Sequence, residues 1–401
     1  MKKIIQISLI LFSIQLNGQD PSFSQFDLSM NHSNPAYTSY EGGTRILSHS
    51  RNQWNRINEN FNNSLFEISS RIKLNKNSRK LKSSWCFGAS VISEDLEFLP
   101  AIGNSVFIKK KEVSLYPFTI EMKITRNSYI SFAPLNISFR KYDLDATNLI
   151  FTDMINDYNN IISTTNFNPN VYLNNEWVSD WSYGFIYTRH GKFSNNKTNR
   201  FNIGFASHHI TKPVESFSGT NNSESEIPTK YTIHSEWYSA IPSWRKPFIP
   251  YYRTMIKHET YRKQGNNIFT KTEFGGTAFI NNTPIEFGLL WRINNNPNQN
   301  LYLQTWVPIL RYRMNNGQHL YILSYSYDGN IAPSNQHLQF LNTSTTHEVG
   351  LAIYLYSGRN RNRNCAAFDL MDNNPLFQDL MNKDNNGLLN KRSIKGNFKW
   401  F

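Results

Sequence analysis

Few residues in this sequence have the types and spacing that catalysis or metal binding requires. The adjacent pairs His208-His209 and His347-Glu348 could serve as metal ligands or as part of a hydrolytic dyad. Neighbouring residues on a strand point to opposite faces, so we expect neither pair to converge on one site. The Asp-Asn-Asn-Gly run at 384–387 is similar to the middle of a calcium loop, but it lacks the spaced acidic ligands and the closing glutamate. We interpret it as a turn.

The usual sequence signatures of enzymes are missing. The sequence contains no G-x-S-x-G, no H-E-x-x-H and no P-loop. Cys86 and Cys365 lie far apart, and they form neither a metal-binding spacing nor a disulfide framework. We therefore expect a protein that is not an enzyme and that uses no metal and no cofactor.

The composition indicates a chain that buries aromatic surface without helical membrane spans. Aromatic residues make up 14% of the 401 residues, whereas disordered chains are poor in them. The only sustained apolar run, residues 4–14, is too short to cross a bilayer, which excludes a helical membrane bundle. The net charge of +13 comes from lysines and arginines scattered between aromatic residues. That pattern is typical of solvated loops and a charged lumen, and it argues against nucleic-acid binding.

Residues 1–18 have the layout of a secretory signal peptide. A positive n-region at residues 1–3 precedes an apolar h-region at 4–16, and Asn17-Gly18 supplies a small-residue cleavage site before Gln19. The residue directly after the cleavage site is Gln19 and not a cysteine, so we expect export without a lipid anchor.

Residues 44–357 alternate between apolar and polar or small side chains with a period of two. The clearest cases are 181–188 and 285–292, and asparagine-rich clusters between such segments predict hairpin turns. The fold class that we predict is all-β, an up-and-down antiparallel arrangement of about 14 strands. Fifteen candidate strands begin near Arg45, Ser64, Trp85, Gly103, Val113, Tyr129, Trp181, Arg200, Tyr231, Phe248, Lys271, Pro284, Leu301, His319 and Thr346.

Alternation alone fits two architectures. A soluble sandwich buries its apolar face, while an outer-membrane barrel turns that face toward lipid. The export signal, the number of strands and the tryptophans near strand ends favour a transmembrane β-barrel in the cell outer membrane. Residues 348–355 also resemble the signal that the assembly machinery reads on the last strand of such barrels.

Four stretches lie outside the strand pattern or interrupt it. Residues 19–43 form a polar N-terminal segment, which we expect on the periplasmic side or as a plug. The loops 141–180 and 212–230 are candidate surface-contact loops if the N-terminus lies in the periplasm. Residues 358–401 form a basic tail, for which a short docking helix and a partly disordered end are both open.

Three motifs near the N-terminus carry a family resemblance. They read DPSFSQF at 20–26, NPAY at 34–37 and RNQW at 51–54, and the softer similarities FGLLWR, YSYD and HEVGLAIYL follow at 287–292, 325–328 and 347–355. Together they resemble the PorP/SprF family of outer-membrane proteins, which belong to the type IX secretion and gliding motility system of Bacteroidetes. Family members usually place a small residue and a glycine directly after the second motif, whereas here Thr38-Ser39-Tyr40-Glu41 precede Gly42-Gly43.

The resemblance implies a non-enzymatic barrel that helps to export secreted proteins or to anchor adhesins at the cell surface. Its implied partners are outer membrane lipid, a secreted adhesin or cargo protein with a type IX C-terminal domain, and periplasmic components of the type IX secretion system. The motifs are either partner-binding residues or a structural plug. These candidates are Asp20, Pro21, Phe23, Ser24, Gln25, Phe26, Asn34, Pro35, Ala36, Arg51, Asn52, Gln53 and Trp54.

Two other functions stay open from the sequence. The first is a diffusion channel with anion preference, which the expected lumen residues Arg71, Lys123, Arg140 and Arg292 would favour. The second is a membrane enzyme such as a lipase or protease, which would need a nucleophile close to His208, His209 or His347.

Overall fold

The computed structural model describes the strands of a barrel and an N-terminal segment. The described residues are 23–40, 42–57, 59–73, 83–98, 106–125, 127–144, 177–193, 197–214, 226–240, 251–263, 266–280, 283–296, 301–315, 319–331 and 346–355. The expected signal peptide, Asp20, Pro21 and the C-terminal tail lie outside them. Within these ranges, no helix has the length and apolar character needed to cross a membrane.

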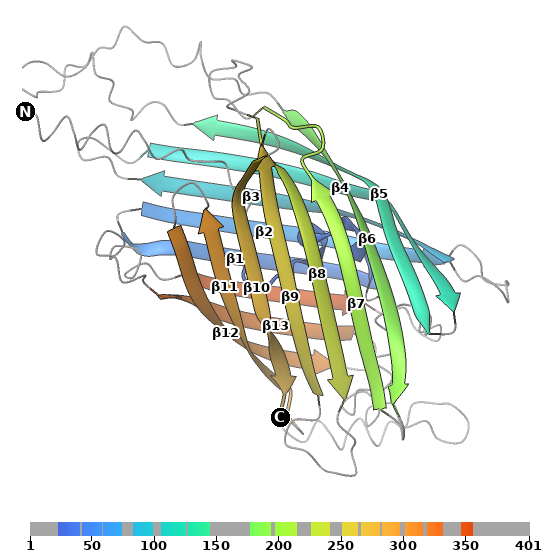
Figure 1. The fold of residues 1–401 in the computed structure, drawn as a ribbon. Helices are drawn as coiled ribbons and strands as arrows, with labels where there is room; N and C mark the ends of the chain where they lie inside the picture. Colours follow the sequence, from blue (N-terminus) through green and yellow to red (C-terminus); the bar gives the residue numbers. More distant parts are fainter. Residues whose placement is uncertain are drawn as a thin grey trace, which may run out of the picture.

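The described strands close into one antiparallel barrel (Figure 1). They are β1 (Thr44–Ile57), β2 (Glu59–Lys73), β3 (Ser83–Phe98), β4 (Val106–Thr125), β5 (Ser128–Leu144), β6 (Val178–Phe193), β7 (Lys197–His208), β8 (Thr229–Ala240), β9 (Tyr251–Lys263), β10 (Asn266–Phe279), β11 (Ile285–Asn296), β12 (Leu301–Asn315), β13 (His319–Ile331) and β14 (Thr346–Leu355). Each strand pairs with its sequence neighbours, and β1 pairs with β14 to close the ring. The predicted fold class is confirmed.

Alternation along the strands places apolar side chains outside and polar side chains inside. On β2, Phe66 and Ile68 are 51% and 43% exposed, whereas Glu67 between them is buried. On β14, Val349 is half exposed and its neighbour Glu348 is buried. Successive side chains on a strand point to opposite faces, so the wall has an apolar outer surface and a charged interior. This arrangement belongs to a transmembrane barrel and is the reverse of a soluble sandwich.

One predicted strand boundary is wrong. The candidates beginning near Gly103 and Val113 form a single strand, β4, whose first half carries three consecutive lysines. Lys110 points inward and pairs with Glu94 of β3, with 3.1 Å between Nζ and Oε1, whereas Lys109 and Lys111 are exposed. The lysines thus follow the alternation of the strand, although their charge hides the apolar pattern in the sequence.

The longest connections lie at one end of the barrel. Residues 145–177 join β5 to β6, residues 209–228 join β7 to β8, and residues 332–345 join β13 to β14. All three connections lie at the same end of the barrel, while β1 begins and β14 ends at the other end. Bacterial barrels carry their long loops outside and their short turns in the periplasm, so we infer that this is the outer end. The predicted loop 141–180 is shorter at both ends, because β5 continues to Leu144 and β6 begins at Val178.

Exposed tryptophans lie toward both ends of the strands. Trp177 and Trp181 stand at the start of β6, and Trp306 stands near the start of β12, all at the outer end. Trp237 lies near the periplasmic end of β8 and is 48% exposed. Tryptophan is favoured at both interfaces of a membrane, where its ring meets lipid and its N–H meets polar groups.

Candidate functional site in the barrel lumen

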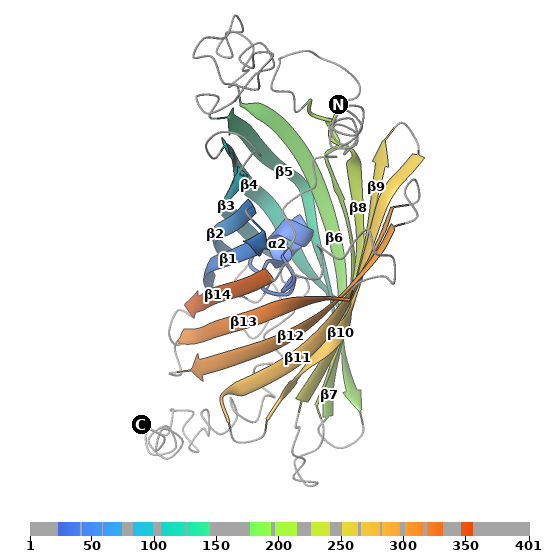
Figure 2. The ribbon, with the colours of Figure 1, turned by 90° about the vertical axis from the view of Figure 1, so that its left-hand side faces the viewer.

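Residues 23–40, here called the lumen segment, lie inside the ring of strands. The segment contains the short helix α2 (Met30–Ser33) and the 3-10 turn η1 (Pro35–Tyr37), and Figure 2 shows α2 surrounded by the barrel wall. All of its residues except His32 are buried. The segment leaves the lumen through a turn in which Ser39, Gly42 and Gly43 adopt positive φ, before β1 begins. It is therefore a plug built from the same chain as the wall.

Apolar contacts hold the lumen segment at three places. One cluster joins Tyr37 and Tyr40 to β5 and β6, a second joins Phe23 and Leu28 to the seam between β1 and β14, and a third places Phe26 against β9, β11 and β12. Burying a side chain of this size stabilises the folded state by about 1.5–3 kcal/mol. Three aromatic residues of the sequence motifs, Phe23, Phe26 and Tyr37, therefore serve as packing anchors in this structure.

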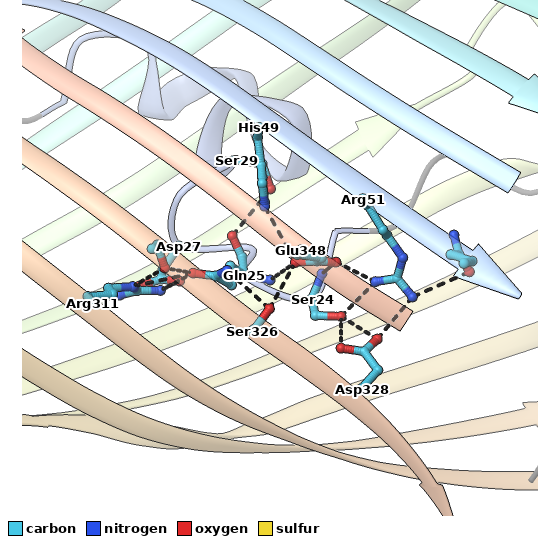
Figure 3. Close-up of polar contacts among 12 residues, drawn as sticks. Ser24, Gln25, Asp27, Ser29, His49, Arg51, Arg311, Ser326, Asp328 and Glu348 are labelled. Carbon is cyan, nitrogen blue, oxygen red and sulfur yellow. Dashed lines mark hydrogen bonds and ion pairs between the residues drawn. The ribbon is translucent and has the colours of Figure 1, made fainter. Parts of the chain in front are cut away.

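Ser24 lies at the centre of a charged network at the seam (Figure 3). Its backbone N–H donates to Glu348 Oε1 at 2.6 Å, and its hydroxyl donates to Asp328 Oδ2 at 2.6 Å. The guanidinium of Arg51 binds both carboxylates, and it lies 3.0 Å from Asp328 Oδ2. Arg292 of β11 donates to the same Asp328 oxygen at 3.0 Å. Ser24 of the first predicted motif and Arg51 of the third thus bind the same two carboxylates, which lie on the last two strands, β13 and β14.

Asp27 lies between two arginines of the far wall. Arg311 donates to both of its carboxylate oxygens, with 2.7 Å from Nη2 to Oδ1, and Arg253 Nη1 donates to Oδ2 at 2.6 Å. Burial alone would raise the pKa of Asp27, but these two guanidinium groups hold it well below its ordinary value. The carboxylate is therefore ionised at any physiological pH. Arg311 also donates to the side-chain oxygen of Gln25 at 3.2 Å.

Asn34 joins the segment to three neighbouring strands. Its side-chain amide donates to the carbonyl oxygens of Phe185 and Phe205, each at 3.2 Å, and lies 2.9 Å from His234 Nε2. Its Oδ1 accepts from the N–H of Ala36 at 2.9 Å, which caps η1, and Pro35 suits the first position of that turn.

Two inward-facing glycines make room for Asn34. A Cβ at Gly184 would collide with Asn34 Oδ1, and one at Gly204 would collide with the ring of His234. The backbone of the wall can approach the asparagine closely only because these positions lack a side chain.

The other residues of the third motif, Asn52 and Gln53, make fewer contacts than Ser24 and Arg51 with the charged side chains of the lumen. Asn52 donates to Asn60 Oδ1 at 3.1 Å, beside the β1–β2 hairpin, and Gln53 Oε1 accepts a long contact of 3.5 Å from Arg51. The side chain of Trp54 lies outside the described part of the chain.

The structure corrects one expectation about the histidines. We expected His208 and His209 to point to opposite faces, but β7 ends at His208 and His209 adopts a positive φ of 60°, so both rings are buried. His208 Nε2 lies 3.2 Å from the carbonyl oxygen of Ser33, and His209 Nδ1 lies 2.6 Å from Asp180. Among the described residues, no group of three or more His, Cys, Asp or Glu residues is placed to hold a metal ion.

The sequence analysis did not predict which wall residues hold the lumen segment, although it named Glu348 as a possible metal ligand and included Asp328 and Glu348 in the softer family similarities. The wall residues are Arg253, Arg311, Asp328 and Glu348, together with His234. The only signal for them is a charged or hydrogen-bonding residue at an inward position of an alternating strand, and many inward positions share it. Among the described buried residues, 11 are lysine or arginine and 12 are aspartate or glutamate. The lumen is therefore nearly balanced in charge.

A comparison of the sequence with protein-family models finds one family that covers most of the chain. The family model for the type IX secretion system membrane protein PorP/SprF matches residues 15–353. The chain belongs to the PorP/SprF family. This confirms the resemblance of the sequence motifs, and the PorP/SprF barrel is accordingly a secretion-related protein of the outer membrane. No curated protein matches the sequence.

Solved structures similar to this PorP/SprF barrel are distant in sequence. The Pseudomonas putida toluene transporter TodX is 9% identical, with 84% of this chain and 94% of that chain covered and a TM-score of 0.42. The Ralstonia pickettii toluene transporter TbuX is 11% identical, with coverages of 85% and 96% and a TM-score of 0.41. A Pseudomonas aeruginosa FadL homologue is 10% identical, with coverages of 82% and 94% and a TM-score of 0.40. Likenesses at this level carry no inference about a shared activity.

Proposed function

We propose that this PorP/SprF barrel helps to export secreted proteins or to anchor adhesins at the cell surface, without catalysing a reaction. Its partners in this proposal are cargo proteins with a type IX C-terminal domain and periplasmic components of the secretion system. The observation that carries the proposal is the lumen segment, which occupies the interior and is fixed to strands on opposite sides of the wall. A barrel filled in this way suits a platform better than a conduit for folded proteins.

The two ends of the barrel divide this task. The long connections 145–177 and 209–228 join strands at the outer end, and in this proposal they contact the exported partner. The connections at the opposite end have at most ten residues. That end also carries the start of β1 and the end of β14, and in this proposal it faces the periplasmic machine. The motif residues from Phe23 to Ala36 act in this proposal through the plug, because they are buried against the wall and do not offer a surface to a partner.

Co-purification tests this function. An affinity tag is inserted at Gly387, the protein is extracted from native outer membranes in mild detergent, and mass spectrometry identifies what it retains. We expect secreted proteins with a type IX C-terminal domain together with periplasmic secretion components. A variant lacking residues 150–170 should lose the cargo and keep the machine components.

The matched control lacks residues 334–343, in another connection at the outer end, and should retain the cargo. Recovery of the barrel alone from cells that secrete normally would overturn the proposal.

A diffusion channel with anion preference is the competing function, and the lumen gives it little support. Three of the arginines that suggested it have acidic partners: Arg71 pairs with Glu121 at 2.8 Å, Arg140 with Glu112 at 3.0 Å and Arg292 with Glu273 at 2.7 Å. The ammonium of Lys123 lies over the ring of Tyr129. Paired cations attract anions weakly, since each is compensated at close range.

A further inference from the structure

Two lysines face each other on the outer surface of the barrel. Lys111 of β4 and Lys141 of β5 are direct cross-strand partners. Both point outward, because their neighbours Lys110 and Arg140 are buried in the lumen. Side chains at such positions start about 5 Å apart, and like charges directly opposite each other destabilise a sheet.

Neither ammonium is compensated by the part of the protein that the structure describes. The inward neighbours are paired: Lys110 contacts Glu94 at 3.1 Å, and Arg140 contacts Glu112 at 3.0 Å. No ion pair or hydrogen bond links Lys111 or Lys141 to another described residue. The two outward charges therefore lack the compensation that the same strands provide on the inside.

Lys111 and Lys141 lie at the border of the apolar outer surface, on the side of the outer end of the barrel. Toward the middle of the barrel, the next outward row runs from Phe66 through Val91 and Val113 to Phe139, all in cross-strand register. The row of the lysines itself contains Ser64 and Ser93, and Trp177 stands beside it at the start of β6, 51% exposed. The lysines therefore lie where lipid tails give way to headgroups.

Acidic residues begin only one row farther out. Asp95 of β3 and Asp143 of β5 flank Lys109 there, and each is its direct cross-strand partner. They lie about 7 Å beyond the lysine pair along the strands. These carboxylates flank Lys109 on the side away from the bilayer, whereas Lys111 and Lys141 have no acidic cross-strand partner in the described ladders.

We propose that Lys111 and Lys141 together bind a phosphate of a phosphorylated glycolipid in the outer leaflet of the outer membrane. A phosphate between the two ammonium groups removes their mutual repulsion and accepts hydrogen bonds from both. The acyl chains of the same lipid lie along Val113 and Phe139, and the ring of Trp177 borders the sugar region. The pair lies at the end of the barrel that carries the long connections, which is the end in contact with that leaflet.

Native mass spectrometry of the full chain in detergent tests this site. The protein is mixed with bisphosphorylated lipid A, with the same lipid after removal of its phosphates, or with phosphatidylglycerol. We expect the double variant Lys111→Gln/Lys141→Gln to retain the phosphorylated lipid about tenfold less than the unsubstituted protein. Both proteins should bind the dephosphorylated lipid equally.

Arg189→Gln is the matched control, because Arg189 is also exposed and outward-facing but lies at the periplasmic end of β6. It should retain lipid A as the unsubstituted protein does. Heat-modifiable migration on gels confirms that each variant is a folded barrel. Equal retention by the double variant, or equal loss in Arg189→Gln, overturns the site, and so does phosphatidylglycerol retained as strongly as lipid A. Cargo co-purification does not depend on this result.

Discussion

Asn34 shows how a single side chain can fix the lumen segment to the wall. It uses both donor hydrogens and its oxygen, and it contacts β6, β7 and β8 at once. Asn34 can lie this close to the backbone of β6 only because residue 184 is a glycine, since any side chain there would enter the space that Asn34 Oδ1 occupies. The two positions are therefore coupled, although 150 positions of sequence separate them.

A double-mutant cycle measures this coupling. Gly184→Ala and Asn34→Ala should each lower the free energy of unfolding by about 1–3 kcal/mol, the first through overpacking and the second through lost hydrogen bonds. The double variant should lose about 1 kcal/mol less than the sum, since removing the amide makes room for the new methyl group. Urea unfolding in detergent micelles, followed by tryptophan fluorescence, gives these values.

Asn60→Ala provides the comparison for that cycle. Asn60 lies beside the β1–β2 hairpin and bonds to Asn52, whereas Asn34 contacts β6, β7 and β8. The effect of Asn60→Ala should therefore add to that of Gly184→Ala. Strict additivity of Asn34→Ala with Gly184→Ala would show that the close approach has no energetic consequence.

At the scale of elements, the strands could be predicted and their interior contacts could not. Period-two alternation depends only on neighbouring residues, so it located the strands from the sequence, and it failed at β4 where three lysines mask the apolar face. The contact between Ser24 and Glu348 spans 324 positions, and only barrel closure brings the two residues together. Ser24 and Arg51 belonged to the predicted motifs, whereas Glu348 was considered only as a possible metal ligand beside His347 and as part of a strand signal.

Deletion of residues 20–37, which removes the lumen segment except for its last three residues, tests the segment as an element. The strand ladders that close the barrel contain none of these residues, so a folded barrel should persist, and heat-modifiable migration on gels would show it. Removing the segment exposes the inner wall to water. In planar bilayers we expect a silent full-length protein and a conducting deletion variant with little ion preference, because the inward charges nearly balance. Retention of cargo should also weaken.

Three results would contradict that account. A strongly anion-selective conductance of the full-length protein would favour the channel, and loss of the folded barrel in the deletion variant would show that the wall needs the segment in order to form. A silent deletion variant that migrates as a folded barrel would mean that other residues also block the lumen.

We infer one orientation of the whole molecule in the outer membrane from the lengths of its connections. All three long connections lie at one end, so a peptide tag inserted at residue 160, between β5 and β6, should bind antibody on intact cells. The same tag at residue 195, between β6 and β7, should bind only after the outer membrane is permeabilised. If the tag at residue 195 binds antibody on intact cells and the tag at residue 160 does not, the orientation is the reverse and Lys111 and Lys141 lie at the inner leaflet.

Glu348 also makes the barrel dependent on the completion of its own synthesis. This residue of the last strand binds Ser24 near the N-terminus and Arg51 on the first strand. A chain that stops before β14 leaves Arg51 without one of its two carboxylates and the edge of β1 without a partner. An incomplete product is thus left with an open edge and an unmatched buried charge, and these two defects distinguish it from a finished barrel.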